Sequence, residues 1–178
     1  MVDVAQAKLI EGWMMESELV WLADRAAEHR SIVEIGSYLG RSTRAMLDNT
    51  EGTVYAIDDW KGPRDIFMEK RERDQLYGRF LQNVHNYLAS PKLVIMARNH
   101  RQMDFDYGKA DMVFLDGSHE YEDVRDDILF WKKRLLPNGL LCGHDIQMSS
   151  VQSAVAETLG EEVDVAPNTT IWYTYNKV

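Results

Sequence analysis

The 178-residue sequence has few of the residues that cross-link or interrupt a chain, with one cysteine and four prolines. The single cysteine, Cys142, excludes an internal disulfide framework and suits a reducing compartment. Basic residues are also scarce, because 20 lysines and arginines face 29 acidic residues and leave a net charge of −9. Binding a phosphate backbone needs a concentrated basic face, so this balance argues against a nucleic-acid partner.

Long apolar runs are absent as well. No stretch approaches the ~18 apolar residues of a membrane span, and the amino terminus has no signal-peptide pattern. We therefore expect a cytoplasmic protein with no membrane partner. The composition still supports a folded core, since 45% of the residues are hydrophobic and 28% are charged. The length predicts a single domain over 1–178, with a leader and helix over 1–30 and the core over 31–178. The apolar leader also offers a surface for a homodimer.

Short apolar strands alternate with helices along the core. Strands are expected at 32–35, 53–57, 93–96, 112–115 and 140–142, and helices at 16–28, after residue 40, within 62–90, at 122–136 and at 151–159. Residues 162–165 and 170–175 face each other across a turn and predict a hairpin. Apolar strands joined by helices predict a parallel sheet covered on both faces. The expected class is α/β: a Rossmann-like doubly wound sheet, mostly parallel, of seven strands with a C-terminal antiparallel hairpin.

The first strand leads into a turn of the kind that binds nucleotide cofactors. Glycines at 36 and 40 let the backbone turn tightly and let a ligand approach closely, and the helix that follows presents unpaired N–H groups. The dinucleotide fingerprint G-x-G-x-x-G needs a glycine where Tyr38 stands. Asp58 after the second strand matches a ribose ligand, but all ribose-binding relatives share that feature. A cofactor with ribose hydroxyls and no pyrophosphate therefore fits better.

Four of the strands deliver acidic, glycine or histidine residues to the same edge of the sheet. Ligands of such sheets bind at the carboxyl ends of the strands, near the point where the strand order reverses. Besides Gly36 and Asp58, the delivered residues are Asp116 after the fourth strand and His144 and Asp145 after the fifth. Packing alone does not explain this set, so we expect the ligand site there.

An ordered set of motifs resembles the class I S-adenosylmethionine (SAM)-dependent methyltransferases. Its members are Glu34-x-Gly36-x-Tyr38-x-Gly40-x-Ser42-Thr43, Asp58, Phe80-x-x-Asn83, Asp116-Gly117-Ser118-His119-x-Tyr121, Pro137-Asn138-Gly139 and His144-Asp145. More narrowly, the chain is similar to the small-molecule O-methyltransferases of the catechol and macrolide-sugar type. The resemblance covers nearly the whole chain from about Glu11. It implies that SAM is the cofactor and that the acceptor is a small molecule, methylated at oxygen.

The resemblance also implies roles for the cofactor residues. Glu34, Gly36 and Gly40 would shape the methionine pocket, with Ser42 binding its carboxylate, as helix amino ends can. Asp58 would bind both ribose hydroxyls, and Trp60 would either wall the adenine or pack on the following helix. Arg98 follows the third strand, where the family places adenine contacts, although it could also be a surface charge. The expected cofactor set is Glu34, Gly36, Ser37, Tyr38, Gly40, Ser42, Asp58, Asp59, Trp60, Ala97, Arg98 and Asp116.

A hydroxyl acceptor must lose a proton, so a base or a metal ion is expected beside it. The candidates are Asp116, His119, His144 and Asp145. In metal-dependent relatives, carboxylates from the fourth and fifth strands hold a cation such as Mg²⁺, and Asp116 and Asp145 stand at the matching places. Those relatives commonly present two adjacent acid or amide ligands after the fifth strand, whereas Asp145 is flanked by His144 and Ile146. In the metal-free version His119 or His144 takes the proton, although each could simply hydrogen-bond a loop.

Two other classes remain open on sequence alone. One is a dinucleotide-dependent oxidoreductase on the same sheet, which the missing middle glycine disfavours. The other is a non-catalytic SAM-binding module, which would not need the clustered histidines and acids. The acceptor itself is not identified, because the segments expected to select it, 2–16 and 61–74, have no readable code.

Overall fold

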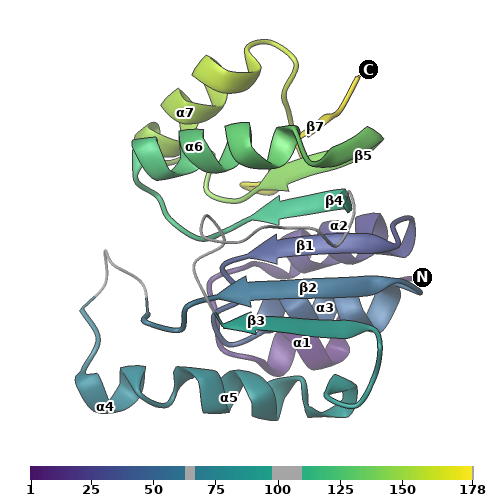
Figure 1. Cartoon of the computed structure of the whole chain (residues 1–178), viewed down its shortest axis with the longest axis vertical. Helices are drawn as coiled ribbons and strands as arrows, with labels where there is room; N and C mark the ends of the chain where they lie inside the picture. Colours follow the sequence, from purple (N-terminus) through teal and green to yellow (C-terminus); the bar gives the residue numbers. More distant parts are fainter. Residues whose placement is uncertain (63–66, 98–109, 178) are drawn as a thin grey trace.

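The computed structural model describes residues 1–62, 67–97 and 110–177. Seven strands form one sheet in the order β3-β2-β1-β4-β5-β7-β6 (Figure 1). The strands are β1 Ser31–Ile35, β2 Thr53–Asp58, β3 Leu93–Ala97, β4 Ala110–Leu115, β5 Leu135–Gly143, β6 Asp164–Val165 and β7 Trp172–Tyr175. Strands β1 to β5 pair in parallel, while β7 runs antiparallel to both β5 and β6. The expected fold class, including the terminal hairpin, is confirmed.

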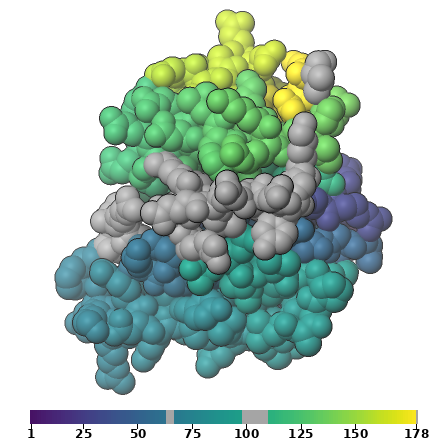
Figure 2. All heavy atoms as spheres, in the orientation of Figure 1, coloured from purple at the N-terminus to yellow at the C-terminus, as the bar shows by residue number. Residues whose placement is uncertain are grey.

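Helices cover both faces of the sheet because neighbouring residues of each strand point to opposite sides. On β1, Ile32 packs into a cluster with α2, α3 and α5, whereas Val33 packs into a second cluster with α6 and α7. Figure 2 shows the same view in space-filling form, with the α6 and α7 half above the α4 and α5 half. The helices are α1 Ala5–Leu9, α2 Glu16–Ala27, α3 Arg41–Asn49, α4 Lys70–Arg73, α5 Leu76–Asn83, α6 Tyr121–Lys132 and α7 Ser149–Leu159, with a 3₁₀ turn, η1, at His85–Tyr87.

Two expected elements have different bounds in the structure. The helix expected to run to residue 136 ends at Lys132, and β5 already begins at Leu135. Leu135, whose side chain is buried, pairs with Ala110 in the strand register, and the register then shifts so that Leu140 pairs with Met112. The Pro137-Asn138-Gly139 run therefore forms an irregularity inside β5. The single crossover helix expected within 62–90 is divided among α4, α5 and η1, and residues 63–66 lie outside the described part.

The leader packs against the domain through α1. Val4, Ala7 and Ile10 are buried in the same cluster as α2 and α3. The Arg41 guanidinium, at the start of α3, donates to the carbonyl oxygens of Met14 and Lys8, both at 3.0 Å, and to that of Ile10. The bonds to Lys8 and Ile10 satisfy carbonyls that the end of the short helix α1 leaves unpaired. Among the described helices, none is long and apolar enough to cross a membrane.

Candidate functional site

Gly36 brings the end of β1 against the end of β4. Its φ of +91° lies in the left-handed region, and a Cβ added there would sit 2.0 Å from the carbonyl oxygen of Asp116. The Asp116 amide in turn donates to the carbonyl of Ile35 at 2.8 Å. Only glycine permits this approach. The turn expected to bind the cofactor and the acid expected at the reaction centre are therefore joined through their backbones.

The turn after β1 is held in place by the end of β2. Tyr38 has a φ of 45°, unusual for a residue with a side chain, and its amide donates to the Asp58 carboxylate at 2.8 Å. The indole Nε1 of Trp60 donates to the Tyr38 carbonyl, also at 2.8 Å. Gly40, with a φ of 87°, is the residue before α3. The strained turn is thus fixed by contacts from the end of the neighbouring strand.

Glu34 lies fully buried beneath this turn. Its carboxylate accepts hydrogen bonds from the hydroxyls of Ser37, at 2.7 Å, and of Ser42 and Thr43. Burial raises the pKa of Glu34 to about 7, while the three hydroxyls oppose the rise and the nearby charge of Asp116 adds to it. Ser42, expected to bind the carboxylate of SAM, therefore directs its hydroxyl hydrogen to Glu34.

Asp58 accepts backbone hydrogen bonds on both oxygens, from Tyr38 and from Trp60 at 2.6 Å. Burial raises its pKa, and these bonds oppose the rise. A carboxylate has about four lone-pair sites, so ribose hydroxyls could still be accepted. Asp59 is exposed, and its carboxylate accepts a hydrogen bond from the Lys61 amide at 3.0 Å.

Of the adenine candidates, Trp60 packs on the crossover helix. It is 7% exposed, and its ring centroid lies 4.8 Å from that of Tyr77 and 4.9 Å from that of Phe80, both on α5. The packing alternative is therefore the one the geometry favours. Ala97 ends β3 opposite Asp58, which puts it at the same edge of the sheet. Arg98 lies outside the described residues.

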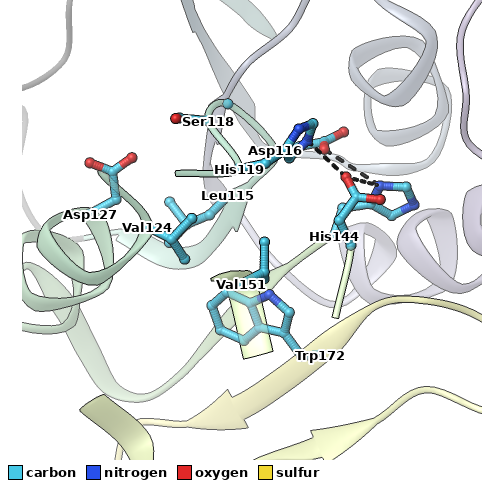
Figure 3. Close-up of a pocket in the computed structure, with 11 residues that line it drawn as sticks. Leu115, Asp116, Ser118, His119, Val124, Asp127, His144, Val151 and Trp172 are labelled. Atoms are coloured by element: carbon cyan, nitrogen blue, oxygen red, sulfur yellow. Dashed lines mark ion pairs between the residues drawn. The ribbon is translucent and has the colours of Figure 1, made fainter. Parts of the chain in front are cut away.

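The four candidates for acid, base or metal chemistry meet at the ends of β4 and β5. His119 Nε2 lies 2.9 Å from Asp145 Oδ2, and His144 Nδ1 lies 3.2 Å from the same oxygen and 3.5 Å from Asp116 Oδ1. Figure 3 shows Asp116, His119 and His144 converging on one side of a pocket that Asp145 also lines, with Asp127 on the opposite side. The pocket also has apolar walls, contributed by Leu115, Val124, Val151 and Trp172.

Charge dominates this cluster. Burial alone would lower the pKa of His144, but Asp116, Asp145 and a third acid, Glu18, raise that pKa to about 12. The pKa of Asp145 moves the other way: burial favours its neutral form, yet His119 and His144 hold it well below its usual range. Burial raises the pKa of Asp116 despite the neighbouring imidazole of His144. The three neighbouring acids thus favour the charged form of the buried imidazole of His144.

Asp116, His144 and Asp145 could also hold a metal ion. One donor atom from each lies within 4.8 Å of the others. Carboxylates are common ligands of Mg²⁺ and Mn²⁺, and imidazole is a common ligand of Zn²⁺ and Fe²⁺, so this mixed set can hold a divalent cation once His144 Nδ1 has lost its proton. The donor set thus fits a divalent cation, with a histidine added to the two expected acids.

Glu18 of α2 joins the cluster and was not among the residues expected from the sequence. It is 1% exposed, and its Oε2 lies 3.1 Å from His144 Nε2. One feature of the sequence could have indicated it: Glu18 lies on the apolar face of α2, together with Leu22 and Ala26, where an acid is unusual.

A family model described as a methyltransferase domain matches residues 33–146, more than half of the chain. Among curated proteins, the uncharacterized protein y4gI of Sinorhizobium fredii (strain NBRC 101917 / NGR234) is 25% identical over 154 residues. The match covers 84% of this chain and only 16% of that relative, so the chain spans a small part of the curated protein it resembles.

Solved structures similar to the chain include several methyltransferases. The O-methyltransferase NovP has a TM-score of 0.69 at 15% identity, covering 91% of this chain and 80% of its own. The precorrin-6y C5,15-methyltransferase of Geobacter metallireducens GS-15 has a TM-score of 0.71 at 15% identity, covering both chains fully. The tRNA (m1A58) methyltransferase TrmI of Aquifex aeolicus scores 0.70 at 10% identity, covering 97% and 75%. Their names indicate different acceptors, so these likenesses support the fold and leave the acceptor open.

Proposed function

This chain belongs to the methyltransferase-domain family and is a SAM-dependent methyltransferase, and we propose that it methylates a hydroxyl oxygen of a small molecule. The observation that carries this proposal is the pairing of His119 with Asp145 beside Asp116, at the edge of the sheet where the glycine turn ends. An acceptor hydroxyl needs a group that removes its proton, and this pair supplies one.

The proposed cofactor position follows the turn over 34–43 and the end of β2. The αL residues of the turn and the first amides of α3 suit the carboxylate end of SAM. Asp58, with acceptor capacity left beyond its two backbone bonds, would bind the ribose. The direct link between Gly36 and Asp116 would then bring the sulfonium close to the acid and histidine cluster.

His119 is the proposed proton acceptor. Its side chain is 30% exposed, so a substrate hydroxyl can reach it, and Asp145 at 2.9 Å would stabilise the imidazolium that forms. His144 suits this role less, because its side chain is 8% exposed and is faced by three carboxylates that keep it charged. Positioning of the reactants would supply the remaining reduction of the barrier, since methyl transfer requires mainly that the oxygen, methyl carbon and sulfur be in line.

A divalent cation is the second part of the proposal. Asp116, His144 and Asp145 would hold it, with His144 ligating through Nδ1. When bound, such an ion supplies Lewis-acid polarisation that lowers the pKa of a hydroxyl beside it. The chain's own residues would keep the acceptor oxygen next to His119 and exclude water through the apolar walls of the pocket.

The test is a product analysis with SAM and a panel of acceptors: catechols, simple phenols, sugar nucleotides, primary amines and a short RNA. Mass spectrometry should find a methyl group added at oxygen of a small molecule. The substitution His119→Asn should lower kcat by about 10²–10⁴-fold, as expected for loss of a general base, and leave SAM affinity unchanged. His85→Asn, at an exposed histidine of η1, is the control. Methylation of amines or RNA alone, or full activity of His119→Asn, would contradict the proposal.

A further inference from the structure

The buried imidazole of His144 has a different partner on each side. Its Nδ1 faces Asp116 and Asp145 in the pocket, whereas its Nε2 points the other way, toward α2. Nε2 is fully buried and has no hydrogen-bond partner among the described residues. The Glu18 oxygen at 3.1 Å is the acceptor within its reach. A buried polar nitrogen needs such a partner, and this one comes from the amino-terminal part of the chain.

Glu18 is itself held from three directions. Oε2 accepts from the Met15 amide at 2.7 Å, and Oε1 accepts from the Thr170 amide at 2.9 Å and the Thr170 hydroxyl at 2.8 Å. Burial would raise the pKa of Glu18, but His144 and these bonds lower it to about 2. The group is therefore an ionised carboxylate with a fixed orientation, and each of its partners is a donor.

We propose that Glu18 is a positioning residue of the methyl-transfer site, which accepts the Nε2–H of His144 and thereby directs Nδ1 at Asp116 and Asp145. The inference rests on the proposed function, because it names a residue that would act on that site through His144. The geometry is that of a carboxylate behind a histidine, which fixes which ring nitrogen carries the hydrogen and how the ring is turned.

The inference holds whether Nδ1 of His144 is protonated or faces a divalent cation. Nε2 carries a hydrogen whether Nδ1 carries one too or faces a divalent cation. In either state Glu18 prevents the ring from turning, which would leave two carboxylates of the pocket facing a carbon atom. The same carboxylate binds the start of α2 and residue 170 of the closing hairpin, so His144 is oriented by elements from both ends of the described chain.

The test combines NMR with kinetics on Glu18→Gln. In the ¹⁵N-labelled wild-type protein, the Nε2 proton of His144 should appear far downfield and exchange slowly, with its assignment given by its loss in His144→Gln. Glu18→Gln should remove or strongly shift this signal. It should also lower kcat on the acceptor found in the panel by about 10–100-fold, the usual effect of losing a supporting carboxylate. Affinity for S-adenosylhomocysteine should stay within about twofold, so that the loss lies in kcat and not in cofactor binding.

A control variant separates the contact with His144 from a general change of charge in α2. Glu16→Gln removes a charge from the same helix turn, at an exposed side chain that pairs with Lys8. It should keep the downfield proton and kcat.

The inference is overturned if Glu18→Gln keeps the downfield proton, or if it keeps kcat within about twofold of wild type. It is also overturned if Glu16→Gln lowers kcat as much as Glu18→Gln does, since the effect would then come from the charge of α2 and not from the contact with His144. If the wild-type protein methylated none of the acceptors, the proposed function would fail, while the NMR comparison would still decide whether Glu18 binds His144.

Discussion

Glu34, buried beneath the turn over 36–40, makes the stability of the protein depend on pH. Its carboxylate is fully buried under three hydroxyl donors, and its pKa is raised from 4.5 to about 7 mainly by burial. In the unfolded chain the group would lose its proton near the ordinary value, whereas the folded protein retains it to higher pH. The folded state therefore binds more protons in that window, and its stability must fall as pH rises.

A matched pair of denaturation series tests this at Glu34. Between pH 4.5 and about 7, wild type should lose stability relative to Glu34→Gln, by an amount on the order of 3 kcal/mol when the window has been crossed. Urea unfolding at several pH values measures the difference. A wild-type stability that rises relative to Glu34→Gln over this window would show that the hydroxyl bonds outweigh burial and that the carboxylate is ionised.

Site residues could be predicted from the sequence where they directly follow a strand. Asp116, His119, His144 and Asp145 follow the ends of β4 and β5, and parallel strands bring such ends together. Their roles in catalysis stay predictions. Glu18 was not foreseen, because it meets His144 only after α2 docks on the sheet, which no local pattern reveals. The partner of Ser42 was missed for a similar reason, since its hydroxyl is drawn to a buried acid.

Among the elements, the leader is hydrogen-bonded to the start of α3, just after the turn over 36–40, by the side chain of Arg41. Arg41 follows Gly40 directly, and its guanidinium binds carbonyls at residues 8, 10 and 14. In the same segment, the ring of Trp13, which is 61% exposed, lies 4.9 Å from that of Tyr38. The segment expected to select the acceptor is thus anchored at the first residue of α3.

Removing that anchor should loosen the leader before it unfolds the domain. In Arg41→Ala, limited proteolysis should cut within residues 8–15 much faster, and stability should fall by about 1.5–3 kcal/mol, the usual effect of losing charged hydrogen bonds. Arg41→Lys should recover only part of this, because an ammonium lacks the planar fork. Arg71→Ala, at an exposed arginine of α4, serves as the control. Unchanged cleavage in Arg41→Ala would show that apolar packing alone holds the leader.

Element order could be predicted from periodicity, and element ends could not. The strands and the closing hairpin were foreseen because apolar runs and turn residues mark them. The end of α6 was wrong because Leu135 continues the apolar stripe of the helix, yet pairs with Ala110 in the sheet. Likewise, the sequence predicts one helix within 62–90, because the apolar spacing there does not show where the segment divides into α4, α5 and η1.

On the scale of the whole molecule, the sheet brings the residues proposed to bind the cofactor and those proposed for the chemistry to neighbouring strand ends. The turn after β1 and the end of β2 face one part of the edge, and the ends of β4 and β5 face the other, with Gly36 in contact with Asp116 between them. The order β2-β1-β4 places the reversal of the chain at this contact, which is where such sheets bind ligands. That the whole of 1–178 forms one domain stays a prediction.

The most direct measurement of this account is a crystal structure of the protein with S-adenosylhomocysteine. The account predicts that the ribose binds Asp58 and that the sulfur, located by its anomalous signal, faces the pocket lined by Asp116, His119 and Asp145. Density for the ligand at another edge of the sheet, or a sulfur directed away from His119, would contradict it.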